Sequence, residues 1–214
     1  MAEELHVLFG SGQVGQPLAR ILLERGKRVR IVKRSAGALP AGAELLRGDA
    51  TDLNFCVEAV REASTVYHCM NPPYYARVWA ELLPRYMDNL IAAAGRSGAR
   101  LVVLDNVYML GHPQGKPLDE DTPLRPCSRK GDVRARVAER MWEAHRCGDV
   151  RATSGRASDF YGPGGTLTHL GDQFLASGHR GQAWVRAGRP GRDPHVSLHS
   201  GRCGGVSGAR HCRR

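Results

Sequence analysis

A glycine-rich loop near the N-terminus is the segment whose residue types and spacing point most directly to chemistry. It follows the apolar run Leu5–Phe9 and has the pattern G-x-G-x-x-G, formed by Gly10, Ser11, Gly12, Gln13, Val14 and Gly15. In this pattern the first glycine permits a tight turn, the second lets a pyrophosphate approach the backbone, and the third lets a helix pack closely on a sheet. The N-terminus of that helix offers N–H groups and a partial positive charge to phosphates. The pattern predicts a dinucleotide-binding loop, and the alternative is a glycine turn without a ligand.

A basic segment, Lys33-Arg34-Ser35, follows the second strand that the sequence predicts. A carboxylate at this place usually binds the ribose 2′-OH of NAD, whereas a guanidinium suits the 2′-phosphate of NADP through a charge-assisted contact. Arg34 therefore favours NADP over NAD as the cofactor. The alternative is that Arg34 is a solvated basic residue after a strand.

The elements that must position these residues follow from the hydrophobic pattern. Apolar and β-branched runs predict strands at residues 5–9, 28–32, 44–49, 65–70, 100–104 and 150–155. Helices are predicted at 14–25, from a cap at Asp52 to about 63, at 79–96 and at 131–146. This alternation predicts an α/β fold, a Rossmann-type doubly wound parallel sheet of about six strands with helices on both faces.

The composition changes near residue 177, which divides the chain into a dinucleotide-binding domain at 1–177 and a tail at 178–214. The tail holds eight Gly, eight Arg and four His, and no Ile, Phe or Met. It lacks the apolar surface that would offset its chain entropy, so it is expected to be largely disordered. No metal site is predicted, because the tail residues His199, Cys203, His211 and Cys212 do not have a familiar zinc spacing.

Charge and hydropathy argue against several other classes of protein. The net charge is +10, but the tail carries +7 of it and the other 177 residues only +3. Because the main domain shows no basic stripe with interleaved aromatic residues, no specific nucleic-acid partner is predicted. No apolar run reaches the ~18 residues of a membrane helix, and the acidic start does not resemble a signal peptide. The six cysteines form no C-x-x-C pair, so free thiols in the cytoplasm are expected.

Five motifs together resemble the short-chain dehydrogenase/reductase superfamily, and most closely its extended and atypical branch, the NAD-dependent epimerase/dehydratase-like proteins. They lie at residues 10–15, 48–52, 68–72, 105–108 and 156–164, within a resemblance that covers about residues 4–170. The resemblance implies that Asp49 and Ala50 lie beside the adenine and that Met70 and Asn71 line the path of the ribose and pyrophosphate. The alternative for Asp49 is a turn residue before a helix.

The resemblance also implies a further site residue and a further site loop. Asn89 matches a helix asparagine near the active site of the family, and its alternative is an exposed helix residue. Residues 161–164 match the loop beside the nicotinamide.

The sequence departs from the superfamily at the catalytic residues. The superfamily uses a Tyr and a Lys four residues on, with a Ser or Thr after the fifth strand, but this chain has Lys130 and Arg134, with Asp105-Asn106 after the strand. A lysine can donate a proton, whereas Arg134 cannot relay one but can hold ribose hydroxyls. The candidate catalytic residues are therefore Lys130, Tyr108 and Asn106. The alternative is that Lys130 and Arg134 are solvated residues on a basic helix.

The resemblance implies an oxidoreductase or epimerase that acts on a sugar nucleotide or a small carbonyl substrate. The alternatives are a non-catalytic NADP-binding regulatory module or an inactive, truncated family member. Family members usually continue for about a hundred further residues that enclose the substrate, so we hypothesise a truncated or frameshifted C-terminus. Family analogy also implies a homodimer through the helices at 79–96 and 131–146.

Overall fold

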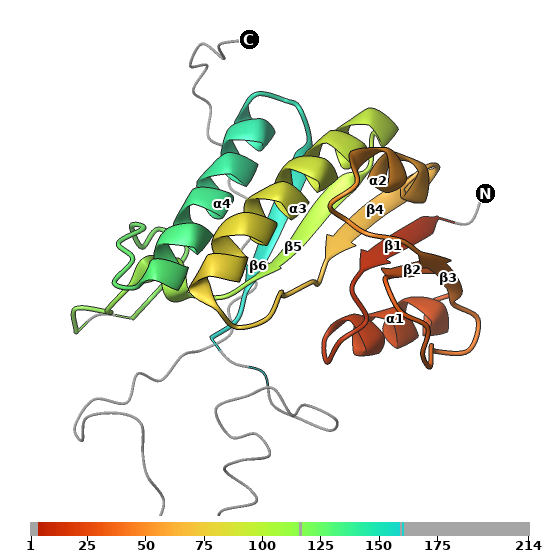
Figure 1. Cartoon of the computed structure of the whole chain (residues 1–214), viewed down its shortest axis with the longest axis horizontal. Helices are drawn as coiled ribbons and strands as arrows, with labels where there is room; N and C mark the ends of the chain where they lie inside the picture. The colour runs from red at the N-terminus through yellow and green to blue at the C-terminus, as the bar shows by residue number, and fades with distance from the viewer. Residues whose placement is uncertain (1–3, 116, 159, 161–214) are drawn as a thin grey trace, which may run out of the picture.

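One parallel sheet of six strands forms the centre of the computed structural model, which describes residues 4–115, 117–158 and 160 (Figure 1). The strands are β1 (Leu5–Phe9), β2 (Arg28–Lys33), β3 (Glu44–Arg47), β4 (Ala63–His68), β5 (Arg100–Asp105) and β6 (Arg151–Arg156). Their order in the sheet is β3-β2-β1-β4-β5-β6, and every neighbouring pair is parallel. The chain runs outward from β1 to β3 and then returns to β4, so the strand order reverses between β1 and β4. Ligands of doubly wound sheets bind at such a switch point, beyond the carboxyl ends of the strands.

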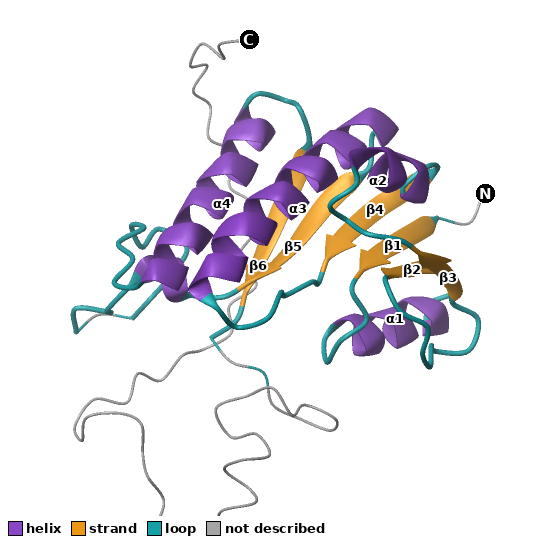
Figure 2. Cartoon of the chain, viewed as in Figure 1, coloured by secondary structure: helices purple, strands orange, loops and turns teal. Residues whose placement is uncertain are grey.

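Helices cover both faces of the sheet, as predicted (Figure 2). The helices are α1 (Gly15–Glu24), α2 (Leu53–Ala59), α3 (Ala76–Ser97) and α4 (Arg129–Arg146), with a short 3₁₀ turn η1 (Tyr108–Leu110). On one face Ala19 and Leu22 of α1 pack with Leu8 and Ile31 of the sheet. On the other face α2, α3 and α4 form a larger cluster with the opposite sides of the same strands. The predicted Rossmann-type fold is therefore confirmed.

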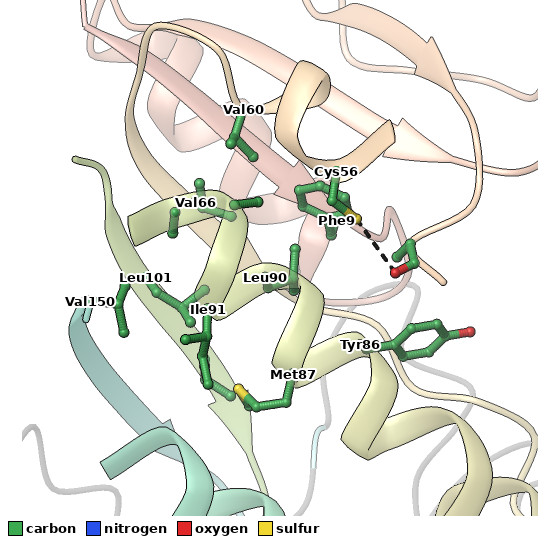
Figure 3. Close-up of a cluster of buried hydrophobic side chains, with 14 of the residues drawn as sticks. Phe9, Cys56, Val60, Val66, Tyr86, Met87, Leu90, Ile91, Leu101 and Val150 are labelled. Atoms are coloured by element: carbon green, nitrogen blue, oxygen red, sulfur yellow. Dashed lines mark hydrogen bonds between the residues drawn. The ribbon is translucent and has the colours of Figure 1, made fainter. Parts of the chain in front are cut away.

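The main core lies between the sheet and helices α2, α3 and α4 (Figure 3). Leu90 of α3 is fully buried in this cluster, together with Phe9, Val66 and Leu101 from the three central strands. All five side chains of β1 are buried, because each face of this central strand has its own layer of helix. A parallel strand that is covered on both faces reads as a continuous apolar run, and this made β1 easy to predict.

The ends of several elements differ from the prediction for local reasons. The helix after Asp52 ends at Ala59 and not near residue 63, because Glu62 has a positive φ of 64° and Ala63 already pairs in β4. The predicted cap is confirmed, since the Asp52 side chain accepts hydrogen bonds from the N–H groups of Asn54 and Phe55. Helix α4 begins at Arg129, two residues earlier than predicted, because Ser128 caps it by accepting from the N–H of Gly131.

The expectation of free thiols holds for three of the described cysteines. Cys56, Cys69 and Cys127 are free, but the expectation is wrong for Cys147, which is disulfide-bonded. Burial raises the pKa of the Cys56 thiol to about 12 and that of Cys69 to about 11, which makes both poor nucleophiles. Within the described part of the chain, no helix is long and apolar enough to cross a membrane. The predicted nicotinamide loop at 161–164 and the predicted tail at 178–214 lie outside the described residues.

Replacement of Leu90 by alanine tests the main core. Leu90 is 0% exposed and contributes to the cluster that joins α3 to the sheet, so Leu90→Ala should lower the free energy of unfolding by about 2–5 kcal/mol. Ile21 on α1 is 46% exposed, and Ile21→Ala should change the free energy of unfolding by less than about 0.5 kcal/mol. Urea unfolding measures both values, and equal effects would contradict the described packing.

Candidate functional site

Two glycines of the G-x-G-x-x-G loop are required by the fold itself. Gly10 has a φ of +102°, and a Cβ there would lie 2.9 Å from the carbonyl oxygen of Cys69. A Cβ on Gly15 would collide with the carbonyl oxygen of Gly10. These contacts let α1 start directly above the ends of β1 and β4, at the switch point of the sheet. The predicted roles of a tight turn and of close helix packing agree with this geometry.

The middle glycine is not required by the fold. A Cβ on Gly12 would have no heavy atom within 4 Å, and Gly12 is not among the glycines with a positive φ. Neither packing nor backbone conformation therefore explains a glycine at this position. A side chain here would fill the space above the loop through which a pyrophosphate approaches the backbone. This open space above the backbone of Gly12, here called the Gly12 cradle, fits a bound dinucleotide.

The N-terminus of α1 lies at the same place and has no internal cap. Its N-cap residue, Val14, makes no side-chain hydrogen bond, and the first turn contains no acidic residue. Asp52 caps α2 and Ser128 caps α4, whereas α3 shares with α1 the lack of a side-chain cap at its N-terminus. An uncapped helix N-terminus favours an anion, because it carries a partial positive charge and N–H donors. The loop residues Ser11 and Gln13 lie within this cradle.

The segment between β3 and α2 forms the predicted adenine side of the site. The Asp49 carboxylate accepts a hydrogen bond of 2.9 Å from the N–H of Thr51, and this bond, with help from nearby Arg34 and Arg85, lowers the pKa of Asp49. Asp49 thus does serve as a turn residue, and its carboxylate is charged. Arg34 is exposed at the end of β2.

The carbonyl of Ala50 anchors this segment to α3. It accepts a hydrogen bond of 2.8 Å from the Asn89 side-chain amide and one of 3.4 Å from the Cys56 thiol. Asn89 is neither an exposed helix residue nor a residue with a free side chain, because it is half-buried and holds the β3–α2 segment in place.

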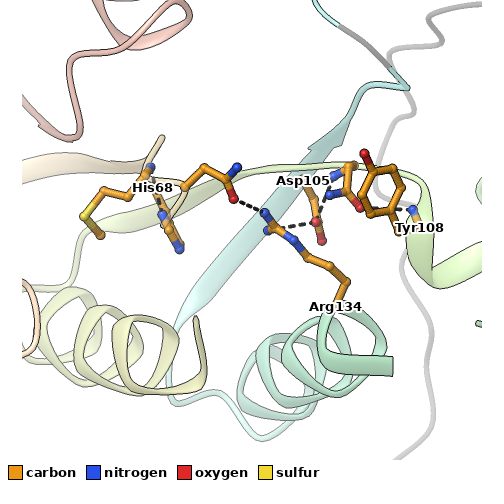
Figure 4. A network of polar contacts seen from close by, with 7 residues as sticks. His68, Asp105, Tyr108 and Arg134 are labelled. Atoms are coloured by element: carbon orange, nitrogen blue, oxygen red, sulfur yellow. Dashed lines mark hydrogen bonds and ion pairs between the residues drawn. The ribbon is translucent and has the colours of Figure 1, made fainter. Parts of the chain in front are cut away.

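A buried polar network lies on the other side of the switch point, at the ends of β4 and β5 (Figure 4). The Arg134 guanidinium donates to the Asp105 carboxylate at 3.1 Å through Nη1 and to the Asn71 side-chain oxygen at 2.9 Å through Nη2. Arg134 and Asp105 are each only 5% exposed. Burial raises the pKa of Asp105 and lowers that of Arg134, and each partner opposes the shift of the other. The pair ties α4 to β5 and to the loop after β4.

His68 lies at the buried end of this network, at the end of β4. Its ring is fully buried at the end of β4, and Nδ1 accepts a hydrogen bond of 3.3 Å from the N–H of Met70. Burial, together with the positive charge of Arg134, lowers the pKa of His68 to about 3. His68 is therefore a neutral structural residue that shapes the turn containing Met70 and Asn71.

The candidate catalytic residues Asn106 and Tyr108 lie directly after β5, and Tyr108 is the first residue of the turn η1. The N–H of Asn106 donates a hydrogen bond to the Asp105 carboxylate. The Asn106 side-chain oxygen accepts a hydrogen bond of 3.0 Å from the N–H of Tyr108. This oxygen therefore has a structural task. The Tyr108 hydroxyl accepts a hydrogen bond of 2.9 Å from the hydroxyl of Tyr74. Tyr74 lies in the loop between β4 and α3.

Lys130 lies against aromatic rings in the first turn of α4. Its ammonium nitrogen is 2.9 Å from the centre of the Tyr74 ring and 5.7 Å from that of Trp79. Arg134 also lies against Trp79, with its Cζ 4.8 Å from the ring centre. The alternative of two solvated basic residues is wrong, because Arg134 is buried and Lys130 is half-buried. The structure thus brings Lys130, Tyr74 and Tyr108 into one cluster.

Sequence reasoning did not identify Tyr74, Trp79 or His68 as parts of the site. The available signal was the aromatic pair Tyr74-Tyr75 after Pro72-Pro73, directly beyond a predicted parallel strand. Among the described residues, no group of three or more His, Cys, Asp or Glu side chains could hold a metal ion.

The geometry agrees with the result of a comparison with known families. The model of the NAD dependent epimerase/dehydratase family matches residues 7–195, so the chain belongs to this family. The expected end of the resemblance near residue 170 is wrong, because the family pattern continues into the predicted tail.

Curated relatives cover only part of the chain. A 3-diazoavenalumate denitrifying reductase of a Streptomyces species is 32% identical over 55% of this chain and 42% of its own length. A UDP-glucose 4-epimerase of Streptomyces lividans is 28% identical over 61% of this chain and 44% of its own length. The chain thus spans less than half the length of these relatives.

Solved structures show the same fold. The Bordetella bronchiseptica enzyme WbmG, solved in complex with NAD and UDP, superposes with a TM-score of 0.72 and 20% sequence identity. The match covers 85% of this chain and 61% of that structure.

Substitution of single loop glycines separates ligand binding from folding. Gly12→Ala should leave the melting temperature unchanged, because its Cβ meets no protein atom, but should weaken the binding of NADPH by at least about tenfold, or 1.4 kcal/mol. Gly15→Ala should instead lower the stability by about 1–3 kcal/mol, because its Cβ meets the Gly10 carbonyl. Thermal melts with and without NADPH measure both effects. Unchanged NADPH binding by a folded Gly12→Ala variant would contradict the cradle.

The buried His68 should make the stability depend on pH. The unfolded chain takes up a proton near pH 6.5, but the folded chain does not until about pH 3, so His68 lowers the free energy of unfolding by about 1.4 kcal/mol per pH unit as the pH falls through this window. His68→Asn keeps an acceptor for the N–H of Met70 and should remove this slope. Urea unfolding between pH 6 and 4 tests it, and the exposed His112 provides the control variant His112→Asn. Equal slopes in both variants would refute a neutral His68.

Proposed function

We propose that this chain binds NADP(H) at the switch point and transfers a hydride between it and a small carbonyl substrate. The observation that carries the proposal is the cradle at Gly12, which lies open at the uncapped N-terminus of α1. The cofactor supplies the hydride when bound. The chain supplies the phosphate contacts through residues 10–15, the adenine contacts through Asp49 and Ala50, and the ribose path through Met70 and Asn71.

The preference for NADP is inferred from the basic residues at the end of β2. Lys33 and Arg34 stand where an NAD site presents a carboxylate, and Arg34 is exposed and close enough to Asp49 to lower its pKa. A guanidinium there attracts the 2′-phosphate and leaves the 2′-OH of NAD without an acceptor. The WbmG structure contains NAD, so NAD is the cofactor that the test must compare.

The cluster of Lys130, Tyr74 and Tyr108, at the start of α4 and η1, would carry out proton transfer. Lys130 and Tyr108 both come from segments at the carboxyl edge of the sheet, and each carries a proton donor. The hydroxyl of Tyr74 donates to Tyr108, which stabilises the phenolate that remains after Tyr108 gives its proton to a substrate oxygen. Asn106 holds the backbone of Tyr108 in this position.

A second candidate function is a non-catalytic, NADP-binding regulatory module. One observation favours it: Arg134 stands at the position of the family's lysine, but its two terminal nitrogens already bind Asp105 and Asn71. The guanidinium also stays charged and cannot relay a proton. A measurement of hydride transfer from NADPH decides between the enzyme and the regulatory module.

The partners of the chain are also part of this proposal. The substrate is a small molecule, a sugar nucleotide or a small carbonyl compound, and the protein acts in the cytoplasm. A homodimer would use the outer face of α3 and α4, which is charged and carries an ion pair of 3.0 Å between Asp88 and Arg140.

Removal of the Arg34 side chain tests the choice of cofactor. Arg34→Ala should weaken NADPH binding by about tenfold or more and leave NADH binding almost unchanged, because only NADPH carries the 2′-phosphate. Arg25, exposed at the end of α1, provides the control variant Arg25→Ala. Isothermal titration of the wild type and both variants with each cofactor gives the dissociation constants, and an equal loss for both cofactors in Arg34→Ala would contradict the role of Arg34.

Kinetics of Tyr108 and Lys130 variants test catalysis. With NADPH and a panel of carbonyl substrates, Tyr108→Phe should lower kcat by at least about a hundredfold while NADPH binding remains, because the proton donor is lost. Lys130→Gln should also impair turnover. NADPH binding by the wild-type chain without any hydride transfer across the panel would support the regulatory module and contradict the enzyme.

A further inference from the structure

Exposed aromatic side chains gather in the loop between β4 and α3. In the part of the chain that the structure describes, the large hydrophobic residues with substantial exposure are Ile21 at 46%, Tyr74 at 56% and Tyr75 at 70%. Two of these three are adjacent, and they lie at the carboxyl edge of the sheet next to the candidate catalytic residues. The fold does not bury them, so their role in stability is small.

Tyr74 belongs to a cluster of three rings. Its ring lies edge-on to Trp79 at 5.3 Å between centres and edge-on to Tyr108 at 6.4 Å, while Trp79 and Tyr108 stack at 6.2 Å. Trp79 is buried and donates through its indole N–H to the carbonyl of Pro72, which fixes the cluster. Fixed ring faces at the edge of a site favour a flat, conjugated group that can stack on them or meet them edge-to-face.

The cluster holds a cation that has no counter-ion among the described residues. The contacts of the Lys130 ammonium with other described residues are those with the rings of Tyr74 and Trp79, and no described carboxylate lies within 4.0 Å of it. Asp105, the buried acid of this region, is already paired with Arg134. An ammonium held in a fixed place beside aromatic faces, without a carboxylate partner, is suited to bind an anionic group of a ligand.

We propose that this cluster binds a planar, conjugated carboxylate, whose ring or unsaturated chain lies against Tyr74 and Tyr108 and whose carboxylate meets Lys130. The proposal rests on the proposed function, because it names the substrate class of the same site. It assigns Lys130 to substrate binding and leaves Tyr108 as the proton donor to a separate aldehyde or ketone group of the same molecule, which accepts the hydride, because the carboxylate itself does not. A sugar nucleotide also carries a flat base and an anionic diphosphate, so it is the competing ligand that the test includes.

The test compares ligands that differ in one property each. Isothermal titration of the full chain, with and without saturating NADPH, uses trans-cinnamate, the uncharged trans-cinnamamide and the non-planar 3-cyclohexylpropanoate. trans-Cinnamate should bind at least tenfold more tightly than either of the other two. Equal binding of the three ligands, no binding of trans-cinnamate, or tighter binding of UDP-glucose would overturn the substrate class.

Matched variants connect the binding to the named residues. Lys130→Gln should reduce the ratio of trans-cinnamate to trans-cinnamamide affinity to about one, and Tyr74→Leu should weaken both ligands at least fivefold. Tyr75→Leu, at the exposed neighbouring ring, should change neither affinity, and all three variants should keep the melting temperature and the NADPH affinity of the wild type. If Lys130→Gln keeps the full preference for the carboxylate, the inference is wrong.

The two failures can be distinguished. NADPH binding without trans-cinnamate binding would overturn this inference and leave the proposed function standing. trans-Cinnamate binding by the Tyr74–Lys130 cluster without NADPH binding would support the inference about the ligand and overturn the proposed cofactor.

Discussion

The buried ion pair between Arg134 and Asp105 determines how the carboxyl edge of the sheet is arranged. Two charges that are each 95% removed from solvent remain there only because they lie 3.1 Å apart and have further hydrogen-bond partners. Asp105 also accepts from the N–H of Asn106, and Arg134 also donates to Asn71. One pair therefore joins β5, the loop after β4 and the helix α4. The loss of one partner alone would leave a buried charge unpaired, at a cost of about 3–5 kcal/mol.

This pair gives Arg134 a structural role at the position where the resemblance implies a catalytic lysine. Arg134 replaces a lysine and is used to hold the framework, while Lys130, one helical turn earlier, reaches the aromatic rings at the mouth of the site. At the other half of the switch point, the loop at Gly10–Gly15 remains open toward a phosphate. The two halves thus have different characters: a cradle of backbone groups, which we propose binds the cofactor, and a cluster of aromatic rings with one cation, which we propose binds the substrate.

The fold was predictable because its signals are local. The apolar run of β1, the glycine loop and the cap at Asp52 each specify their own conformation, so the six strands and four main helices were found with small errors at their ends. The error at α2 came from Glu62, whose positive φ no helix pattern announces. The site was less predictable, because the contact of Lys130 with Tyr74 joins residues more than fifty positions apart and depends on the packing of α4 against α3. The sequence likewise could not show that Arg134 is buried, since arginines on a basic helix are usually solvated.

Equilibrium titration of the purified chain with NADPH and with NADH tests directly whether the Gly12 cradle is a dinucleotide site with a preference for the 2′-phosphate. We expect one molecule to bind per chain, with NADPH bound more tightly than NADH. Ligand at a hundred times its Kd should also raise the stability by about 2.7 kcal/mol. If a folded chain bound neither cofactor at millimolar concentration, the cradle would be a structural turn and the proposed function would be wrong.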